Sequence, residues 1–184
     1  MEQLSPTAYV ILGMVRQEPR SGYEIKALVD NSTRFFWAAS YGQIYPELKR
    51  LSEGGLIVGS DSPTGGRRRT VYAITEDGEE ELRGWLRQAP QTFEMRDEGL
   101  LKLFFAAALP REEALEILRA MRAQRLAINA RLQAIKDLKL KGESEDSFPL
   151  IVLEGGLEFT EWFVDWCERM EARLLASAPE KRSS

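Results

Sequence analysis

Apolar residues in the first third of the chain recur every three or four positions, the spacing of helices that bury one face. Ser5 followed by Pro6 is typical of a helix start, because the serine side chain caps early amide groups and proline fits the first turn. Pro19 ends this helix. Ser21 with Glu24 three residues later has the capping-box pattern and predicts a second helix.

A third helix is predicted from residue 40 to residue 51. Its apolar stripe consists of Ile44, Leu48 and Leu51, which leaves a polar face on the other side. Pro46 is discordant, because an interior proline lacks the amide N–H and crowds the carbonyl four residues earlier. Two interpretations stay open: a kink eased by the glycine at position 42, or a regular helix that begins only near Tyr45.

Two strand-like segments follow, at residues 56–58 and 71–74. The segment between them, residues 60–66, has turn chemistry throughout and ends in two glycines, so a β-hairpin is predicted. Arg67-Arg68-Arg69 leads from these glycines into the second strand. The hairpin is therefore a basic wing that directly follows the third helix.

Thr75 caps a fourth helix, and Pro90 closes a first domain of residues 1–90. The predicted fold is mainly α: an amino-terminal winged helix-turn-helix with a two-stranded β wing, followed by a carboxy-terminal helical dimerisation domain. That second domain, with a possible effector role, is expected over residues 93–176. A polar tail occupies residues 177–184.

The second half of the chain is predicted to be helical. A helix over residues 93–109 is followed by a helix start at 110–112, a polar loop at 141–146 and a final helix. The longest helix carries a heptad stripe made of Ala114, Leu118, Met121, Arg125, Ile128, Leu132, Ile135 and Lys139. A heptad stripe of this kind requires a partner helix. The pair Gly155-Gly156 either breaks the start of the final helix or allows a second helix to approach it closely.

A dimer interface is predicted from this stripe and from the aromatic face of the final helix. Its residues are Leu118, Met121, Arg125, Ile128, Leu132, Ile135, Phe159, Trp162, Phe163 and Trp166. Arg125 fixes the register by pairing across the dimer, or lies at the edge of a bundle. The tryptophans Trp37, Trp85, Trp162 and Trp166 could line an aromatic effector pocket, but large aromatics at helical spacing are more often core or interface.

Composition removes several functional classes. The 184 residues are 43% hydrophobic and 29% charged, as in globular proteins, and no apolar run is long enough to cross a bilayer. The amino terminus has no secretory pattern, so a cytoplasmic location is expected. The chain has no histidine and one cysteine, Cys167, which excludes Ser-His and Cys-His catalytic pairs and imidazole metal ligands. No enzyme activity, metal or cofactor is predicted.

The positive charge is concentrated where DNA contacts are predicted. The net charge is −4, and residues 1–90 carry 11 Lys and Arg against 12 Asp and Glu. Five of those eleven cations lie on the third helix and the wing: Lys49, Arg50, Arg67, Arg68 and Arg69. A phosphate-facing surface needs charge placed in this way, and the acidic remainder keeps other faces away from DNA.

The predicted DNA-contacting residues are Ser40, Tyr41, Gln43, Tyr45, Lys49, Arg67, Arg68 and Arg69. Gln43 can pair with an adenine edge and Lys49 with a phosphate, while a tyrosine ring can contact a thymine methyl. The arginines contact phosphates, or Arg68 or Arg69 enters the minor groove. The alternatives are an ordinary solvated loop for the arginines and helix surface or core packing for the tyrosines.

Several motifs together resemble the PadR family of transcriptional regulators. They are Leu4-Ser5-Pro6, Ser21-Gly22-Tyr23-Glu24-Ile25, the segment from Gly42 to Leu51 with its Tyr45-Pro46 pair, Gly55-Leu56-Ile57, and Tyr72 to Gly78. Residues 93–176 resemble, more loosely, the helical domain of virulence-activator-like members. The resemblance implies a homodimeric, usually repressing, DNA-binding regulator with interlocking carboxy-terminal helices. Members often respond to a small molecule such as a phenolic acid or a drug.

The predicted function is therefore that of a sequence-specific DNA-binding regulator, a homodimeric repressor that responds to a small aromatic effector. Its expected partners are double-stranded operator DNA, a second copy of the chain and a small-molecule effector, with no membrane. The alternative is a winged-helix adaptor whose basic wing binds an acidic protein and not DNA.

Overall fold

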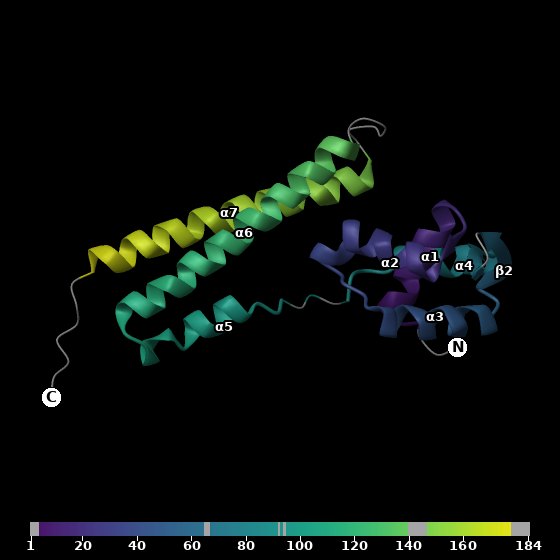
Figure 1. The fold of residues 1–184 in the computed structure, drawn as a ribbon, viewed down its shortest axis with the longest axis horizontal. Helices are drawn as coiled ribbons and strands as arrows, with labels where there is room; N and C mark the ends of the chain where they lie inside the picture. Colours follow the sequence, from purple (N-terminus) through teal and green to yellow (C-terminus); the bar gives the residue numbers. More distant parts are fainter. Residues whose placement is uncertain (1–3, 65–66, 92, 94, 140–146, 178–184) are drawn as a thin grey trace. The chain divides into compact units, whose positions relative to one another are not determined.

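The computed structural model describes residues 4–64, 67–91, 93, 95–139 and 147–177 (Figure 1). The chain divides into two compact units, Met1–Phe93 and Glu94–Ser184, and each is described by itself. The predicted glycine turn at 65–66, the predicted loop at 141–146 and residues 178–184 of the predicted tail lie outside the described residues.

The first unit contains four α-helices whose starts are fixed by side-chain caps. Its helices are α1 (Pro6–Gln17), α2 (Gly22–Asn31), the 3-10 turn η1 (Thr33–Phe35), α3 (Tyr41–Glu53) and α4 (Glu76–Leu86). Ser5 caps α1, Ser21 and Glu24 form the predicted capping box of α2, and Thr75 caps α4. The buried core lies between these helices and includes Ile11, Ile25, Ile44 and Leu48.

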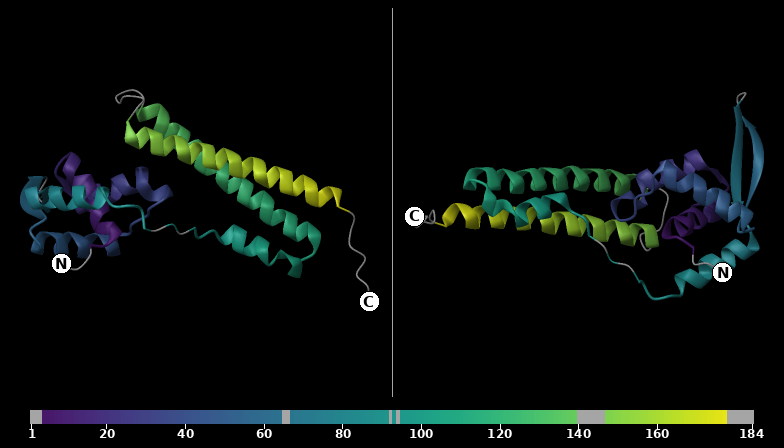
Figure 2. Two further views of the ribbon diagram at one scale, coloured as in Figure 1. Left: turned by 180° about the vertical axis from the view of Figure 1, so that it is seen from behind. Right: turned by 90° about the horizontal axis from the view of Figure 1, so that it is seen from below.

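The wing is a longer hairpin than the sequence predicted. Strand β2 (Ile57–Thr64) pairs antiparallel with β3 (Arg67–Ile74), and a two-residue strand β1 (Arg20–Ser21) pairs with the other edge of β3, giving the order β1-β3-β2. Residues 60–64, predicted as turn, lie in β2, because pairing with β3 satisfies their backbone without an apolar face. Figure 2 shows the hairpin extending beyond the helices of its unit.

The second unit consists of α5 (Glu98–Phe104), the 3-10 turn η2 (Ala106–Ala108), α6 (Arg111–Lys139) and α7 (Phe148–Ala176). The prediction of a helix starting at residue 93 is wrong. Asp97 has an extended backbone and its carboxylate accepts a hydrogen bond from the Leu100 amide, so α5 begins at residue 98. The mainly helical architecture with a two-stranded wing after α3 is otherwise confirmed.

Helices α6 and α7 lie side by side (Figure 1), and part of the heptad stripe is buried. Leu118, Met121 and Leu132 are buried in this way within a single chain. Helix α7 runs through residues 155 and 156 without a break. A Cβ added at Gly156 would lie 3.3 Å from the Leu132 side chain, so this glycine allows α6 to approach closely, which was one of the two predicted roles.

A candidate nucleic-acid interface

Helix α3 begins with a cap built from two of the predicted contact residues. The side-chain oxygen of Gln43 accepts hydrogen bonds from the backbone nitrogen of Ser40 at 2.9 Å and from its hydroxyl at 3.0 Å. These bonds define the first turn of α3. They also commit the Gln43 carbonyl oxygen to the cap and leave the amide NH₂ as the group that can reach a base.

Pro46 lies inside α3 without ending it. The regular helix starts at Tyr41, so the interpretation that it begins only near residue 45 is wrong. Proline lacks the amide that would donate to the carbonyl of Gly42, and this carbonyl is on a part of the helix that faces solvent. Water can therefore satisfy the freed acceptor.

Tyr41 and Tyr45 form an exposed aromatic pair one turn apart on α3. Their rings stack with centroids 6.1 Å apart and an interplanar angle of 20°. The pair lies beside the buried stripe of Ile44, Leu48 and Leu51, on the flank of α3 that meets Gly22 of α2, with 44% of Tyr41 and 51% of Tyr45 exposed. The pair is thus available to a partner outside the chain.

The charged residues of α3 divide between solvent and the protein. Lys49 is exposed and lies 3.7 Å from the Glu53 carboxylate, a pair that two solvated side chains hold only weakly. The Glu47 carboxylate faces inward and accepts a hydrogen bond from the Ser5 hydroxyl at 2.6 Å. Glu47 therefore joins the start of α1 to α3, while Lys49 remains free to move toward a phosphate.

The wing is attached to the first turn of α2 through Arg69, which pairs with Ser62 in the outer half of the hairpin. The Arg69 guanidinium lies 3.1 Å from the Glu24 carboxylate, which also accepts hydrogen bonds from the backbone nitrogen and hydroxyl of Ser21 at 2.8 Å each. The Ser21 backbone N–H, more than its hydroxyl and Arg69, holds the pKa of Glu24 below its ordinary value. For Arg67 and Arg68 the structure describes the backbone in β3, and their side chains lie outside the described part.

Sequence reasoning assigned Glu24 to a helix cap and missed its ion pair with the wing. It also missed Lys26, whose ammonium lies 5.6 Å from the centroid of the Tyr41 ring. The link between residues 24 and 69 depends on β1, which sets Ser21 opposite Val71. A two-residue strand has no sequence pattern of its own, so this juxtaposition could not be read from the chain.

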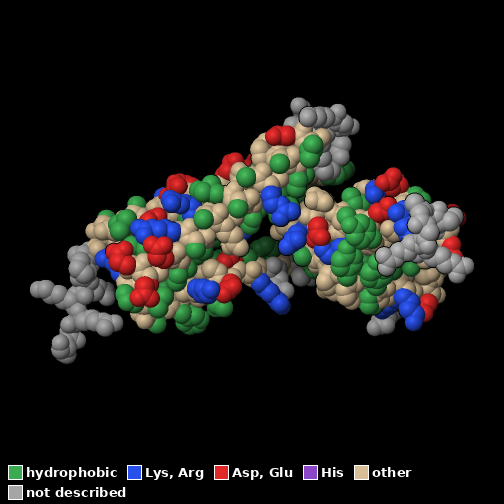
Figure 3. All heavy atoms as spheres, viewed as in Figure 1, with side chains coloured by type: hydrophobic (Ala, Val, Ile, Leu, Met, Phe, Trp, Pro, Cys, Tyr) green, Lys and Arg blue, Asp and Glu red, His purple; other side chains and the backbone are tan. Residues whose placement is uncertain are grey.

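The predicted dimer-contact residues occupy different environments in the second unit. Leu118, Met121, Leu132 and Phe163 are buried within the chain; Ile128, Ile135 and Trp166 are half-buried; Phe159 and Trp162 are exposed and stack at 5.9 Å. Figure 3 shows exposed hydrophobic side chains between charged ones on the surface of this unit. The four buried residues fill the core of one chain, and Phe159 and Trp162 are the two of this set that face outward.

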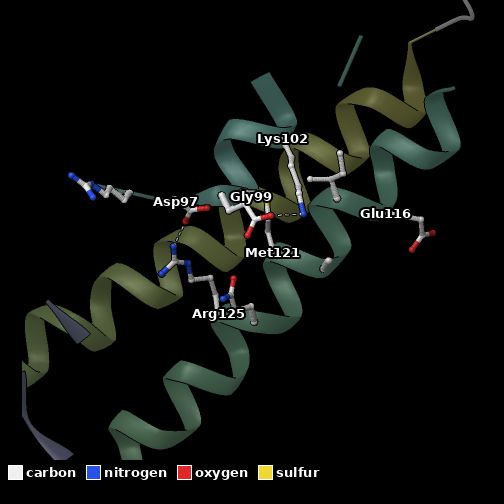
Figure 4. Close-up of a pocket in the computed structure, with 11 residues that line it drawn as sticks. Asp97, Gly99, Lys102, Glu116, Met121 and Arg125 are labelled. Carbon is white, nitrogen blue, oxygen red and sulfur yellow. Dashed lines mark hydrogen bonds and ion pairs between the residues drawn. The ribbon is translucent and has the colours of Figure 1, made fainter. Parts of the chain in front are cut away.

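Arg125 has a partner within its own chain. Its guanidinium forms an ion pair with the Asp97 carboxylate at the start of α5 (Figure 4). It also lies 4.4 Å from the centroid of the Phe163 ring. The pair is mostly shielded from solvent, with 18% of the Arg125 side chain and 11% of the Asp97 side chain exposed. Arg125 thus connects α6 to α5 and α7.

Each unit has a cavity lined by described residues. A cavity of about 670 Å³ between α5 and α6 is lined by as many acidic as basic side chains: Asp97, Glu98, Glu116, Arg96, Lys102 and Arg125 (Figure 4). A cavity of about 410 Å³ between α1 and α4 includes Trp85, whose ring stacks on Tyr9 at 4.5 Å. Trp37, Trp162 and Trp166 line neither cavity.

The described residues contain no group of three or more Cys, Asp or Glu side chains placed to hold a metal ion. Nor is any helix within those residues long and apolar enough to cross a membrane.

Comparisons with known proteins identify the family. Residues 11–84 match the model of the transcriptional regulator PadR-like family, and residues 95–174 match the virulence activator alpha C-terminal model. The chain is 32% identical over 174 residues to the negative transcriptional regulator PadR of Bacillus subtilis, covering 90% of this chain and 96% of that protein. The chain belongs to the PadR-like family of transcriptional regulators.

Solved structures of the Bacillus subtilis PadR protein have the same fold. Its crystal structure in complex with operator DNA matches with a TM-score of 0.81 at 32% identity, over 91% of this chain and 98% of that chain. Its complex with p-coumaric acid matches with a TM-score of 0.75 at 30% identity, over 95% and 100% of the two chains. The predicted family resemblance and winged-helix fold are therefore confirmed.

Proposed function

We propose that this PadR-like regulator is a homodimeric repressor that binds operator DNA through α3 and the wing. The observation that supports this most is the meeting of both elements at the first turn of α2. Tyr45 of α3 packs against Gly22, and Arg69 of the wing pairs with Glu24. A helix for the groove and a basic hairpin are thereby held on one scaffold, as a winged-helix reader requires.

Within this proposal the exposed side of α3 enters the major groove. Tyr41 and Tyr45 contact bases through their rings, Gln43 donates from its amide while its oxygen maintains the cap with Ser40, and Lys49 leaves Glu53 for a phosphate. Arg67, Arg68 and Arg69 contact phosphates or the minor groove. Arg69 must leave the Glu24 carboxylate to contact DNA, because the carboxylate and the phosphate are anions that compete for the same guanidinium.

The proposed dimer buries the outward stripe of α7. Phe148, Val152, Phe159 and Trp162 follow one another at spacings of four, seven and three residues and are all exposed. A contiguous apolar surface of this kind typically marks a protein interface. One winged-helix unit reads only a few base pairs, so two copies on half-sites about one helical turn, ~34 Å, apart supply affinity and specificity.

The solved complex of the Bacillus subtilis PadR protein with p-coumaric acid supports a further part of the proposal. We expect a small aromatic acid to weaken operator binding by this regulator, which acts in the cytoplasm by binding and not by catalysis. Titration of p-coumaric acid into the protein–operator complex, followed by fluorescence anisotropy, checks this expectation. Complexes that remain intact at saturating acid would remove the effector from the proposal.

The decisive experiment is sequencing of genomic DNA fragments captured by the purified protein. The proposed function requires enrichment of a palindromic site, and sedimentation of the complex should show two chains for each site. Capture of random fragments only, or of none, would instead favour an adaptor that binds an acidic protein. The comparisons favour the DNA-binding function, since the matched relative is described as a transcriptional regulator.

The contribution of the wing to DNA binding can be tested through the salt dependence of the binding constant. Arg67→Ala with Arg68→Ala should reduce the slope of log K against log salt by about 3.6 for a dimer on its operator, because the two chains together lose four phosphate contacts and each contributes about 0.9. Arg87→Ala, at the end of α4 and paired with Glu80, is the control. An unchanged slope in the double variant would show that these two wing arginines do not contact phosphates.

A further inference from the structure

Two residues of α2 form a seat for the tyrosine pair of α3. Gly22 and Lys26 are one helical turn apart, as are Tyr45 and Tyr41. A Cβ placed on Gly22 would lie 2.8 Å from Cε1 and 3.2 Å from Cζ of Tyr45, so the ring rests on the glycine backbone. The Lys26 ammonium lies 5.6 Å from the centroid of the Tyr41 ring.

The Lys26 side chain is itself fixed. Only 15% of it is exposed, and its ammonium is ion-paired with Asp30, one turn further along α2. The cation is therefore held beside the Tyr41 ring by α2 and is poorly placed to reach solvent. Such a contact between a held cation and an aromatic ring favours one ring position over the others.

We propose that Gly22 and Lys26 are positioning residues that hold Tyr41 and Tyr45 in one orientation for DNA contact. Helix α2 then contributes to sequence preference without touching the bases. This inference rests on the proposed role of α3 in binding DNA. It follows from the geometry because half of each ring is seated against α2 or the neighbouring ring, while the other half is open to a partner.

The expected effect is on the conformational entropy that the two tyrosine side chains lose when DNA binds. A side chain that is already fixed loses little conformational entropy on binding, which changes affinity by roughly two- to tenfold for each side chain. Gly22→Ala places a methyl group where the Tyr45 ring now lies, and the half-exposed ring can rotate into solvent to admit it. The same methyl group would lie 3.0 Å from Cδ1 of the buried Leu48, which must shift slightly, so the folding of the variant is checked by thermal unfolding before binding is measured.

The test is a double-mutant cycle on the operator recovered by fragment capture, read by fluorescence anisotropy. Gly22→Ala should weaken operator binding by roughly two- to tenfold and leave binding to random duplex and its salt slope unchanged. In a Tyr45→Ala background, Gly22→Ala should cause no further loss. Gly84→Ala in α4 is the control, since its Cβ would meet no atom within 4 Å.

Several outcomes would overturn the inference. These are an unaffected Gly22→Ala chain, an equal loss on random duplex, or a loss that persists without the Tyr45 ring. If Gly22→Ala proves unstable, the cycle of Lys26→Met with Tyr41→Ala decides instead. A salt slope lowered by about 1.8, which is about 0.9 for each of the two chains, would show that Lys26 contacts a phosphate directly. Failure of the wild-type chain to bind any DNA would reject the proposed function together with this inference.

Discussion

The ion pair between Asp97 and Arg125 makes a quantitative prediction about the second unit. In Asp97→Asn the side-chain oxygen still caps Leu100, but the partly buried Arg125 loses its counter-charge. An unpaired buried charge costs about 3–5 kcal/mol and an exposed one less than about 1. Because Arg125 keeps some solvent and the Phe163 ring, we expect a loss of about 2 kcal/mol.

Hydrogen exchange of the α5 amides in the full-length chain, read by mass spectrometry, measures this loss as a fall in the free energy of opening. Asp97→Ala should lose about 1 kcal/mol more, because the cap of α5 is removed as well. Glu98→Gln is the matched control, since its ion pair with Lys102 is mostly exposed and its loss should change the free energy of opening far less than the loss of the Asp97 pair does. The reasoning is refuted if Asp97→Asn costs as little as the control. It is also refuted if the cost disappears when the protein is diluted, as it would for a contact made across a dimer.

Three further predictions concern the side chains of Thr160, Glu24 and Tyr9. Thr160→Val removes the acceptor of the 2.8 Å hydrogen bond from Asn129 and should cost about 1 kcal/mol in urea unfolding, because the half-buried Asn129 amide loses a protein partner that water replaces only in part. Glu24 has a lowered pKa, chiefly through the Ser21 N–H, so its stabilisation is present above about pH 4.3 and lost below it; the Glu24→Gln and wild-type chains should converge in acid. Burial raises the pKa of Tyr9 to about 12, so its contribution should be lost between about pH 10 and 12, and an ultraviolet titration should lack this late step in Tyr9→Phe.

The starts of α1, α2 and α4 were predictable because their caps are local, whereas the predicted start of α5 was five residues too early. Ser5, Ser21 with Glu24, and Thr75 each satisfy amide groups within three residues, so a short sequence window contains both partners. The wing was predicted in place but not in length. Its outer half is stabilised by backbone pairing in a solvated ribbon, which imposes no apolar alternation on residues 60–64.

The residues of α3 that form the candidate interface were predictable from the sequence, but the contacts that hold them in position were not. Polar residues opposite the apolar stripe of α3 could be found from periodicity alone. The contacts that orient them join distant segments: Gly22 with Tyr45, Lys26 with Tyr41, and Glu24 with Arg69. A single chain without its fold carries no pattern that pairs these positions.

The heptad stripe of α6 shows what such a pattern leaves undetermined. Apolar residues at alternating spacings of three and four require a partner helix, but the requirement is the same whether that helix belongs to the same chain or to a second copy. In this chain α7 supplies it, burying Leu118 and Leu132. Because α7 also carries Phe159 and Trp162 on its outward side, it offers apolar surface to another copy, and the cost of leaving that surface in water is the physical reason to expect a dimer.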